Sequence, residues 1–173
     1  MGYQRRLANY RSFRKHLTVP LITVELSYGE DFELQADEAD VLVQLRGRDV
    51  MWQKERLLNV ALQNLPSECS KVVWLDCDVI FGREDWSEGV SRLLDEFSLV
   101  QPFSCVHHLP QDLRLGEIGT AGAEFSRSSV ASAVASGLSA CACLTRNPAL
   151  RMKDMYSTGM AWAARRELLD ERV

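Results

Sequence analysis

The stretch Lys71-Val72-Val73-Trp74-Leu75-Asp76-Cys77-Asp78 decides the fold class. Its first five residues are almost wholly apolar, which is typical of a parallel strand buried on both faces of a sheet. The run stops at two carboxylates, Asp76 and Asp78. Ligands of open α/β sheets bind beyond the carboxyl ends of such strands. The stretch therefore predicts a strand over 71–75 that ends at a candidate site.

Helical and extended patterns alternate on both sides of this strand. Apolar residues at steps of three and four predict helices, and short apolar runs bounded by Gly or Pro predict strands. A possible capping box at Asp85 and Glu88 predicts where the helix after the carboxylates begins. The predicted helices cover residues 3–17, 51–65, 128–136 and 164–172 and one that starts at 85; the predicted strands cover 21–26, 41–45, 71–75, 99–103 and 159–163. This order predicts a single α/β domain over 1–173, with a mainly parallel central sheet and flanking helices.

Composition limits the possible partners. The 173 residues are 46% hydrophobic and 25% charged, as in an ordinary globular domain, and the net charge of -4 argues against a nucleic-acid partner. The absence of a long apolar run predicts no transmembrane segment. The five cysteines are an odd number and no signal peptide is recognised, so we expect reduced thiols and a cytoplasmic location.

The carboxylate pair suggests a metal site. Residues i and i+2 of an extended backbone point the same way, so Asp76 and Asp78 are expected on one side and Cys77 on the other. Two like charges this close repel each other, and a hard divalent cation relieves the repulsion. Mg²⁺ and Mn²⁺ suit oxygen ligands of this kind. The alternative is a pair of ordinary turn aspartates, but the apolar runs on both flanks favour the metal site.

Three segments resemble one known family. Leu75-Asp76-Cys77-Asp78-Val79-Ile80-Phe81 resembles the DxD segment of GT-A glycosyltransferases, the family 2-like members of the nucleotide-diphospho-sugar transferase superfamily. The stretch from Trp52 to Leu62 resembles the helix with a basic residue and an LLN sequence in that family. The stretch from Ser157 to Leu169 resembles the segment G-x-A-x-A-x-R-R-E-x-L that lines the donor and acceptor sites.

This resemblance implies a GT-A fold and a site for a nucleotide-diphosphate sugar. A metal on Asp78 would hold the diphosphate, Asp76 would lie near the ribose or the metal, and Lys54 near the diphosphate. Gly159, without a Cβ, would let the backbone approach the sugar, although an ordinary turn glycine is an equal alternative. The acceptor would be a hydroxyl of a glycan, lipid or small molecule.

The same resemblance implies a domain that is incomplete at both ends. Family members begin with a strand and loop that precede the segment matched by Gly2 onward, and they continue into an acidic segment that supplies the catalytic base. That base is therefore expected beyond Val173 and is not identified.

Two other functions compete with this interpretation. An apolar strand followed by D-x-D also fits the nucleophile motif of HAD-type phosphohydrolases, in which Asp76 would attack phosphorus and Asp78 would act as the acid/base. That motif normally follows the first strand of its fold, whereas two strands are predicted upstream here. A non-catalytic remnant of the GT-A fold is the third possibility.

The remaining candidate residues have plainer interpretations. His107 and His108 could complete a metal shell, but loop histidines without such a role are commoner. Among the tryptophans, Trp52 is the candidate for stacking on a ligand, and the other three are expected in the core. Cys141 and Cys143 lack the second pair that a zinc site needs. The arginines and the lysine near the N-terminus predict a solvated helix face, with a phosphate-facing role as the alternative; they are Arg5, Arg6, Arg11, Arg14 and Lys15.

Overall fold

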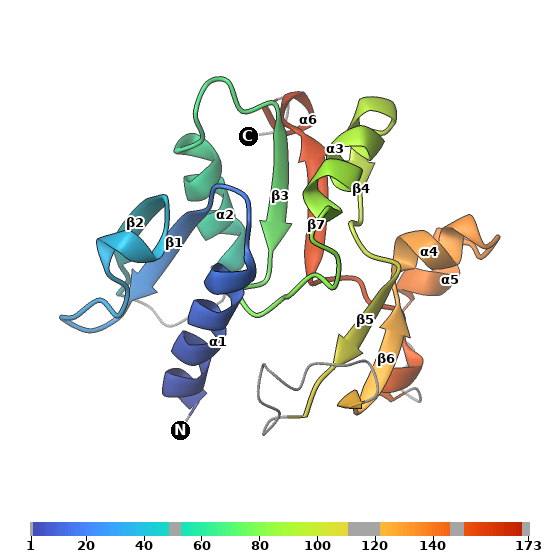
Figure 1. The fold of residues 1–173 in the computed structure, drawn as a ribbon, viewed down its shortest axis with the longest axis horizontal. Coiled ribbons are helices and arrows are strands. Elements are labelled where there is room, and N and C mark those ends of the chain that lie inside the picture. Colours follow the sequence, from blue (N-terminus) through green and yellow to red (C-terminus); the bar gives the residue numbers. More distant parts are fainter. Residues whose placement is uncertain (1, 49–52, 111–121, 146–150, 171–173) are drawn as a thin grey trace.

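The computed structural model describes residues 2–48, 53–110, 122–145 and 151–170 as a mixed α/β protein (Figure 1). Its helices are α1 (Gly2–His16), α2 (Lys54–Gln63), α3 (Trp86–Glu96), α4 (Val130–Ala135), α5 (Ala140–Leu144) and α6 (Arg166–Asp170), with 3-10 turns η1 (Ala36–Glu38) and η4 (Met152–Asp154). Its strands are β1 (Ile22–Ser27), β2 (Val41–Arg46), β3 (Lys71–Leu75), β4 (Leu99–Val100), β5 (Cys105–His108), β6 (Phe125–Ser128) and β7 (Ala161–Arg165).

The described strands form three small sheets. β1 pairs with β2 in parallel, β7 lies between β3 and β4 and is antiparallel to both, and β5 and β6 form an antiparallel pair. The mainly parallel central sheet that the sequence predicts is therefore not what the described pairs show. Because β3 and β4 are each antiparallel to β7, they run in the same direction. The apolar runs locate the strands, but they do not encode the direction in which a late strand enters the sheet.

One hydrophobic core joins the first two sheets. Its centre is made by buried residues of α1 and α3, including Phe13, Trp86 and Leu94, together with Ala163 of β7. Partly buried side chains of both sheets pack against this centre, among them Leu42 of β2. The steps of three and four in α1 and α3 place these residues on one helix face, as amphipathic helices require. The core therefore fixes α1 and α3 against the sheet that carries Asp76.

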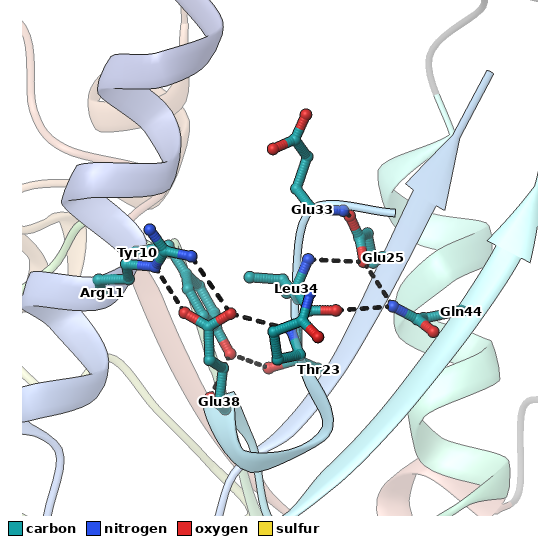
Figure 2. A network of polar contacts seen from close by, with 9 residues as sticks. Tyr10, Arg11, Thr23, Glu25, Glu33, Leu34, Glu38 and Gln44 are labelled. Atoms are coloured by element: carbon teal, nitrogen blue, oxygen red, sulfur yellow. Dashed lines mark hydrogen bonds and ion pairs between the residues drawn. The ribbon is translucent and has the colours of Figure 1, made fainter. Parts of the chain in front are cut away.

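The basic helix α1 is tied to the acidic segment that precedes β2. Arg11 pairs with Glu38 at 2.6 Å, and Arg14 pairs with Asp40 at 3.0 Å. Tyr10 adds a hydrogen bond from its hydroxyl to the backbone carbonyl of Glu38 at 2.8 Å and contacts Thr23 Oγ1 at 3.0 Å (Figure 2). Burial is the main cause that raises the pKa of Tyr10, so the hydroxyl stays protonated and donates. Two basic side chains of α1 thus have acidic partners within the chain.

A second part of the same network holds the acidic segment against the parallel pair. The Glu25 carboxylate of β1 accepts from the backbone N–H groups of Glu33 and Leu34 at 2.6 and 3.3 Å. Gln44 of β2 donates to Glu25 Oε2 and to the Leu34 carbonyl, both at 3.0 Å (Figure 2). The acidic segment between β1 and β2 is therefore anchored, and its Leu34 is buried.

The β5–β6 hairpin with α4 and α5 forms a separate small cluster beside the main sheet (Figure 1). Gln101, which is buried after β4, donates to the Ser157 carbonyl at 2.9 Å and accepts from the Ala131 N–H at 3.0 Å. Val130 of α4 and Cys143 of α5 belong to a second buried cluster. A buried amide that donates to one segment and accepts from another fixes the cluster to the end of β4.

Several local predictions are confirmed and others are wrong. The helix predicted over 128–136 forms as α4, and the Ser129 side chain caps it. The capping box is wrong, because Asp85 makes no side-chain cap and instead pairs with Arg83 at 2.6 Å. The histidines expected in a loop lie on β5. The last strand begins later than predicted, at Ala161.

Candidate functional site

A cavity of about 210 Å³ lies at the end of β3, and three of the predicted site residues line it. They are Lys54 from the start of α2, Asp76 directly after β3, and Gly159 just before β7. The rest of the lining is mainly apolar and is made by Leu58, Trp74, Leu75, Met160, Ala161 and Trp162. Residues separated by more than a hundred positions are thus brought together as the sequence predicts.

The β3–β7 ladder explains why these residues meet. Leu75 lies opposite Ala161, so the chain leaving β3 and the chain entering β7 share one end of the sheet. The Asp76 N–H donates to the Met160 carbonyl at 2.8 Å and extends the contact by one residue beyond the strand. Met160 has a φ of 73°, which lies in the left-handed region. This conformation is energetically unfavourable for any residue that has a Cβ atom. Backbone strain of this kind is concentrated at functional sites.

Lys54 and Asp76 form an ion pair across the cavity. The exposed fractions of their side chains are 44% and 31%, so the pair remains in contact with solvent. The ammonium offsets the charge of the carboxylate in the absence of a ligand. An anionic group entering the cavity would meet a cation that is already positioned at its mouth.

Asp78 occupies a different place from the one expected. The backbone turns at Cys77 and Asp78, and the Val79 N–H donates to the Asp76 carbonyl at 3.3 Å. The chain is therefore not extended here, and the argument that i and i+2 share a side does not apply. Asp76 lines the cavity and Asp78 is exposed outside it. The cause is the end of the ladder at Leu75, which removes the pairing that keeps a backbone extended.

Cys77, between the two carboxylates, remains a neutral thiol. Protein atoms pack around its solvent-accessible side chain, and this partial desolvation, followed by the charges of Asp78 and Asp76, raises the pKa of Cys77. A raised pKa reduces the thiolate that would act as a nucleophile. The five cysteines form no disulfide in the structure, and Cys143 is buried.

The β5–β6 pair holds His108 between an arginine and an aromatic ring. Arg127 Nε donates to His108 Nε2 at 3.2 Å, and the His108 ring stacks on Phe125 with centroids 4.3 Å apart. Burial and then the Arg127 charge lower the pKa of His108, while the nearby carboxylates of Asp78 and Glu124 partly oppose them. The lowered pKa favours the neutral imidazole, whose Nε2 accepts from Arg127. His107 points elsewhere and contacts the Ser126 hydroxyl at 2.6 Å.

Two tryptophans that were predicted to lie in the core line the cavity instead. Trp74 and Trp162 are partners in the β3–β7 register, and both are only half-buried. Trp162 is also held by a hydrogen bond from its indole N–H to the Thr158 carbonyl at 2.8 Å. Trp86 is buried as expected and stacks on Phe81. Trp52, the predicted stacking residue, lies outside the described residues.

Gly159 is not required by the packing. A Cβ built there would meet no atom within 4 Å, and its φ is not in the left-handed region. The glycine therefore leaves open space in the cavity wall, which fits both a ligand that approaches closely and an ordinary turn glycine. The two arginines of the same segment behave differently. Arg165 lies opposite Lys71 at the other end of the ladder, so Arg165 and Arg166 do not line the cavity of Asp76.

Two carboxylates offer oxygen ligands at this end of β3, Asp76 in the cavity wall and the exposed Asp78 outside it. Mg²⁺ and Mn²⁺ take oxygen ligands and typically use one or two carboxylates together with phosphate oxygens. Asp76 and Asp78 lie on one turn, and the exposed Asp78 can accept such an ion. In the part of the chain that the structure describes, no three His, Cys, Asp or Glu side chains form a group that could hold a metal ion. A divalent cation at this turn would need further ligands, such as the phosphate oxygens of a substrate.

Comparison with known proteins does not assign this site. No family model matches the chain, and neither the curated proteins nor the solved structures contain a match. Over the described residues, none of the helices combines the length and apolar character needed to cross a membrane.

Proposed function

We propose that the chain is a GT-A type domain of a metal-dependent glycosyltransferase, which moves a sugar from a nucleotide-diphosphate donor to an acceptor hydroxyl. The observation that carries the proposal is the convergence of Lys54, Asp76 and Gly159 on one cavity. These three residues come from three separate segments, and the resemblance selected each of them for the donor site. A cytoplasmic location belongs to the same proposal.

The arrangement of the strands supports this fold. β3 and β4 run in the same direction, and β1 and β2 are parallel to each other. We infer that these strands are the parallel part of a GT-A sheet, with β7 as its antiparallel member. The carboxylates lie at the carboxyl end of β3, where open α/β sheets bind ligands.

Each residue has a role that follows from its position. Lys54 would pair with the diphosphate when the anion displaces it from Asp76. Trp74 and Trp162 provide an apolar wall against which a sugar or base can pack. A cation bound by the carboxylates would offset charge that develops on the diphosphate leaving group. A cavity of about 210 Å³ is smaller than common ligand pockets of about 300 to 1,000 Å³, so part of the donor would extend over the open rim.

Thermal protection is the direct test. UDP or GDP with Mn²⁺ should raise the melting temperature, because a ligand that binds only the folded state stabilises it. Ligand at ~100 times its dissociation constant would contribute ~2.7 kcal/mol. Asp78→Asn should reduce this shift strongly in Mn²⁺ and only slightly with a chelator, whereas Lys54→Gln should reduce it in both, because its charge acts without the metal.

The matched control is Asp37→Asn, a surface carboxylate of η1 that lines neither this cavity nor the one at the other end of the ladder. Equal shifts for the wild type and for both site variants would contradict the proposal. Cleavage of an aryl phosphate with Mg²⁺ alone, lost in Asp76→Asn, would instead establish the phosphohydrolase. No nucleotide effect and no cleavage would leave the non-catalytic remnant.

A further inference from the structure

A second cavity, of about 340 Å³, lies at the opposite end of the β3–β7 ladder from Asp76. Three basic side chains and one acidic side chain contribute to its wall, beside two serines and a cysteine. The lining residues are Ser67, Cys69, Ser70, Lys71, Arg165, Arg166 and Glu167. The positive side chains outnumber the negative one, in a concave surface that also carries hydroxyl donors.

The ladder itself assembles the basic side chains. Lys71, the first residue of β3, lies opposite Arg165, the last residue of β7. The Arg166 N–H then donates to the Ser70 carbonyl at 2.8 Å, which continues the contact past the strand ends. The Arg166 guanidinium donates to the Pro66 carbonyl at 2.6 Å and holds the loop that forms the opposite wall. The cavity is therefore built by backbone pairing.

Exposed carboxylates now partner two of the three cations. Lys71 pairs with Asp95, whose side chain is 65% exposed, and Arg165 lies beside Glu167, whose side chain is 71% exposed. The Arg165 Nε atom is buried and 3.3 Å from Glu167 Oε1, yet no group in the described part of the chain accepts a hydrogen bond from it. Exposed ion pairs are weak and exchange readily. Lys71 Nζ also donates to the carbonyl and hydroxyl oxygens of Ser91 at 2.7 and 2.9 Å, and Arg165 Nη2 donates to the Ser98 hydroxyl at 2.6 Å. The buried Arg165 Nε therefore lacks an acceptor, and the carboxylates of Asp95 and Glu167 are the partners that a stronger anion can displace.

We propose that this cavity is a binding site for a phosphate group, either as the free ion or as part of a small phosphorylated molecule. Guanidinium groups bind tetrahedral oxyanions through paired N–H donors, and the lysine adds a point charge. A phosphate oxygen would accept from Arg165 Nε and replace the Glu167 carboxylate, while the Lys71 ammonium would keep its Ser91 contacts and exchange Asp95 for the phosphate. The site does not depend on the function proposed for Asp76, because the ladder separates the two cavities.

Phosphate titration tests the site. Inorganic phosphate added to isotope-labelled protein should shift the backbone amide signals of Ser70, Lys71 and Glu167 saturably, and leave that of Asp76 in place. Arg165→Gln should raise the dissociation constant about tenfold or more, because a charge-assisted hydrogen bond is lost. Arg83→Gln is the matched control, since this arginine is exposed and lines neither cavity.

A second variant keeps the test decisive if Arg165→Gln fails to fold. Glu167→Gln removes the competing carboxylate at an exposed position and should tighten phosphate binding.

Repeating the titration with glycerol phosphate separates the two sources of the phosphate group. Tighter binding of glycerol phosphate than of inorganic phosphate indicates a phosphorylated molecule, and equal binding indicates the free ion. Asp78→Asn should change neither result. Non-saturable shifts, or equal affinities for the wild type, Arg165→Gln and Glu167→Gln, would overturn the proposal.

Discussion

The two ends of the β3–β7 ladder carry different side chains on the same two strands. One end, called the acidic end, holds the smaller cavity, which is lined by the Asp76 carboxylate, by an apolar wall and by Lys54 of α2. The other end, called the basic end, holds the larger and more polar cavity, which is lined by Lys71, Arg165 and Arg166. Residues inside the ladder are committed to pairing and to the core, so polar side chains gather where the pairing stops.

The strand β7 also explains why residues close in the sequence line different cavities. Gly159 lies just before β7 and Arg165 is its last residue, so the length of the strand separates them. Antiparallel pairing places Ala161 opposite Leu75 and Arg165 opposite Lys71. A motif that spans a whole strand is therefore divided between two sites, and only its first part can act with Asp76.

The largest expected effect comes from removing what both ends share. Leu94 of α3 is 1% exposed and belongs to the core cluster under the sheet. Leu94→Ala should lower the free energy of unfolding by about 2 to 5 kcal/mol through lost burial and a cavity. Urea unfolding measures this loss, and ligand binding at both ends should weaken together as the folded fraction falls.

Leu93→Ala, at the preceding position of α3, is the matched control. Its side chain is 45% exposed, so the change should stay within about 0.5 kcal/mol. Similar losses for the two variants would mean that α3 does not support the ladder as the packing indicates.

The sequence located most of this scaffold because the relevant signals are local. Apolar runs and helical steps placed β1, β2, β3, α1 and α3 within a few residues. It failed on β5 and β6, where a strand of four residues such as Cys105–His108 offers too little periodicity. It also missed the order of the sheets, since strand direction depends on contacts that are distant in the sequence.

The candidate site was predictable in part for the same reason. Asp76, Lys54 and Gly159 could be selected from motifs, and the structure brings them together. The exposed position of Asp78 was missed because the backbone turns where the ladder stops. Trp74 and Trp162 were assigned to the core because an apolar run does not reveal which face meets a cavity. The basic end had no recognised motif at all, since Lys71 and Arg165 meet only through the strand register.

An intermediate effect should separate binding from stability at the acidic end. Gly159→Ala places a methyl group in open space, so the free energy of unfolding should change by no more than about 1 kcal/mol. The same methyl narrows the cavity and should weaken protection by UDP or GDP with Mn²⁺, while phosphate binding at Arg165 stays unchanged. Calorimetric titration and thermal melting measure the two quantities separately.

Gly137→Ala provides the structural counterpart. Gly137 follows α4 with a φ of 97°, which an alanine adopts only at a cost of about 1 to 3 kcal/mol. This variant should lose stability and keep the site intact. If Gly159→Ala kept full nucleotide protection, Gly159 would be an ordinary turn glycine and not part of a ligand wall.

The smallest effect is a pH dependence that arises at His108 on the β5–β6 pair. Burial and the Arg127 charge lower the pKa of His108 below 6.5, so the unfolded chain binds more protons than the folded chain in the window just under that pH. The free energy of unfolding therefore falls as the pH drops from 6.5 through the folded-state pKa, and this loss of stability in acid should be smaller in His108→Gln.

Two further variants fix the sign of this effect. Arg127→Gln removes a cause that lowers the pKa of His108 and should reduce the acid loss, whereas Asp78→Asn removes a cause that raises it and should increase the loss. Thermal melting between pH 7.5 and 5 measures each difference. Changes of the same sign in Arg127→Gln and Asp78→Asn would show that His108 does not sense the carboxylate, and that the hairpin is electrostatically separate from the acidic end of the ladder.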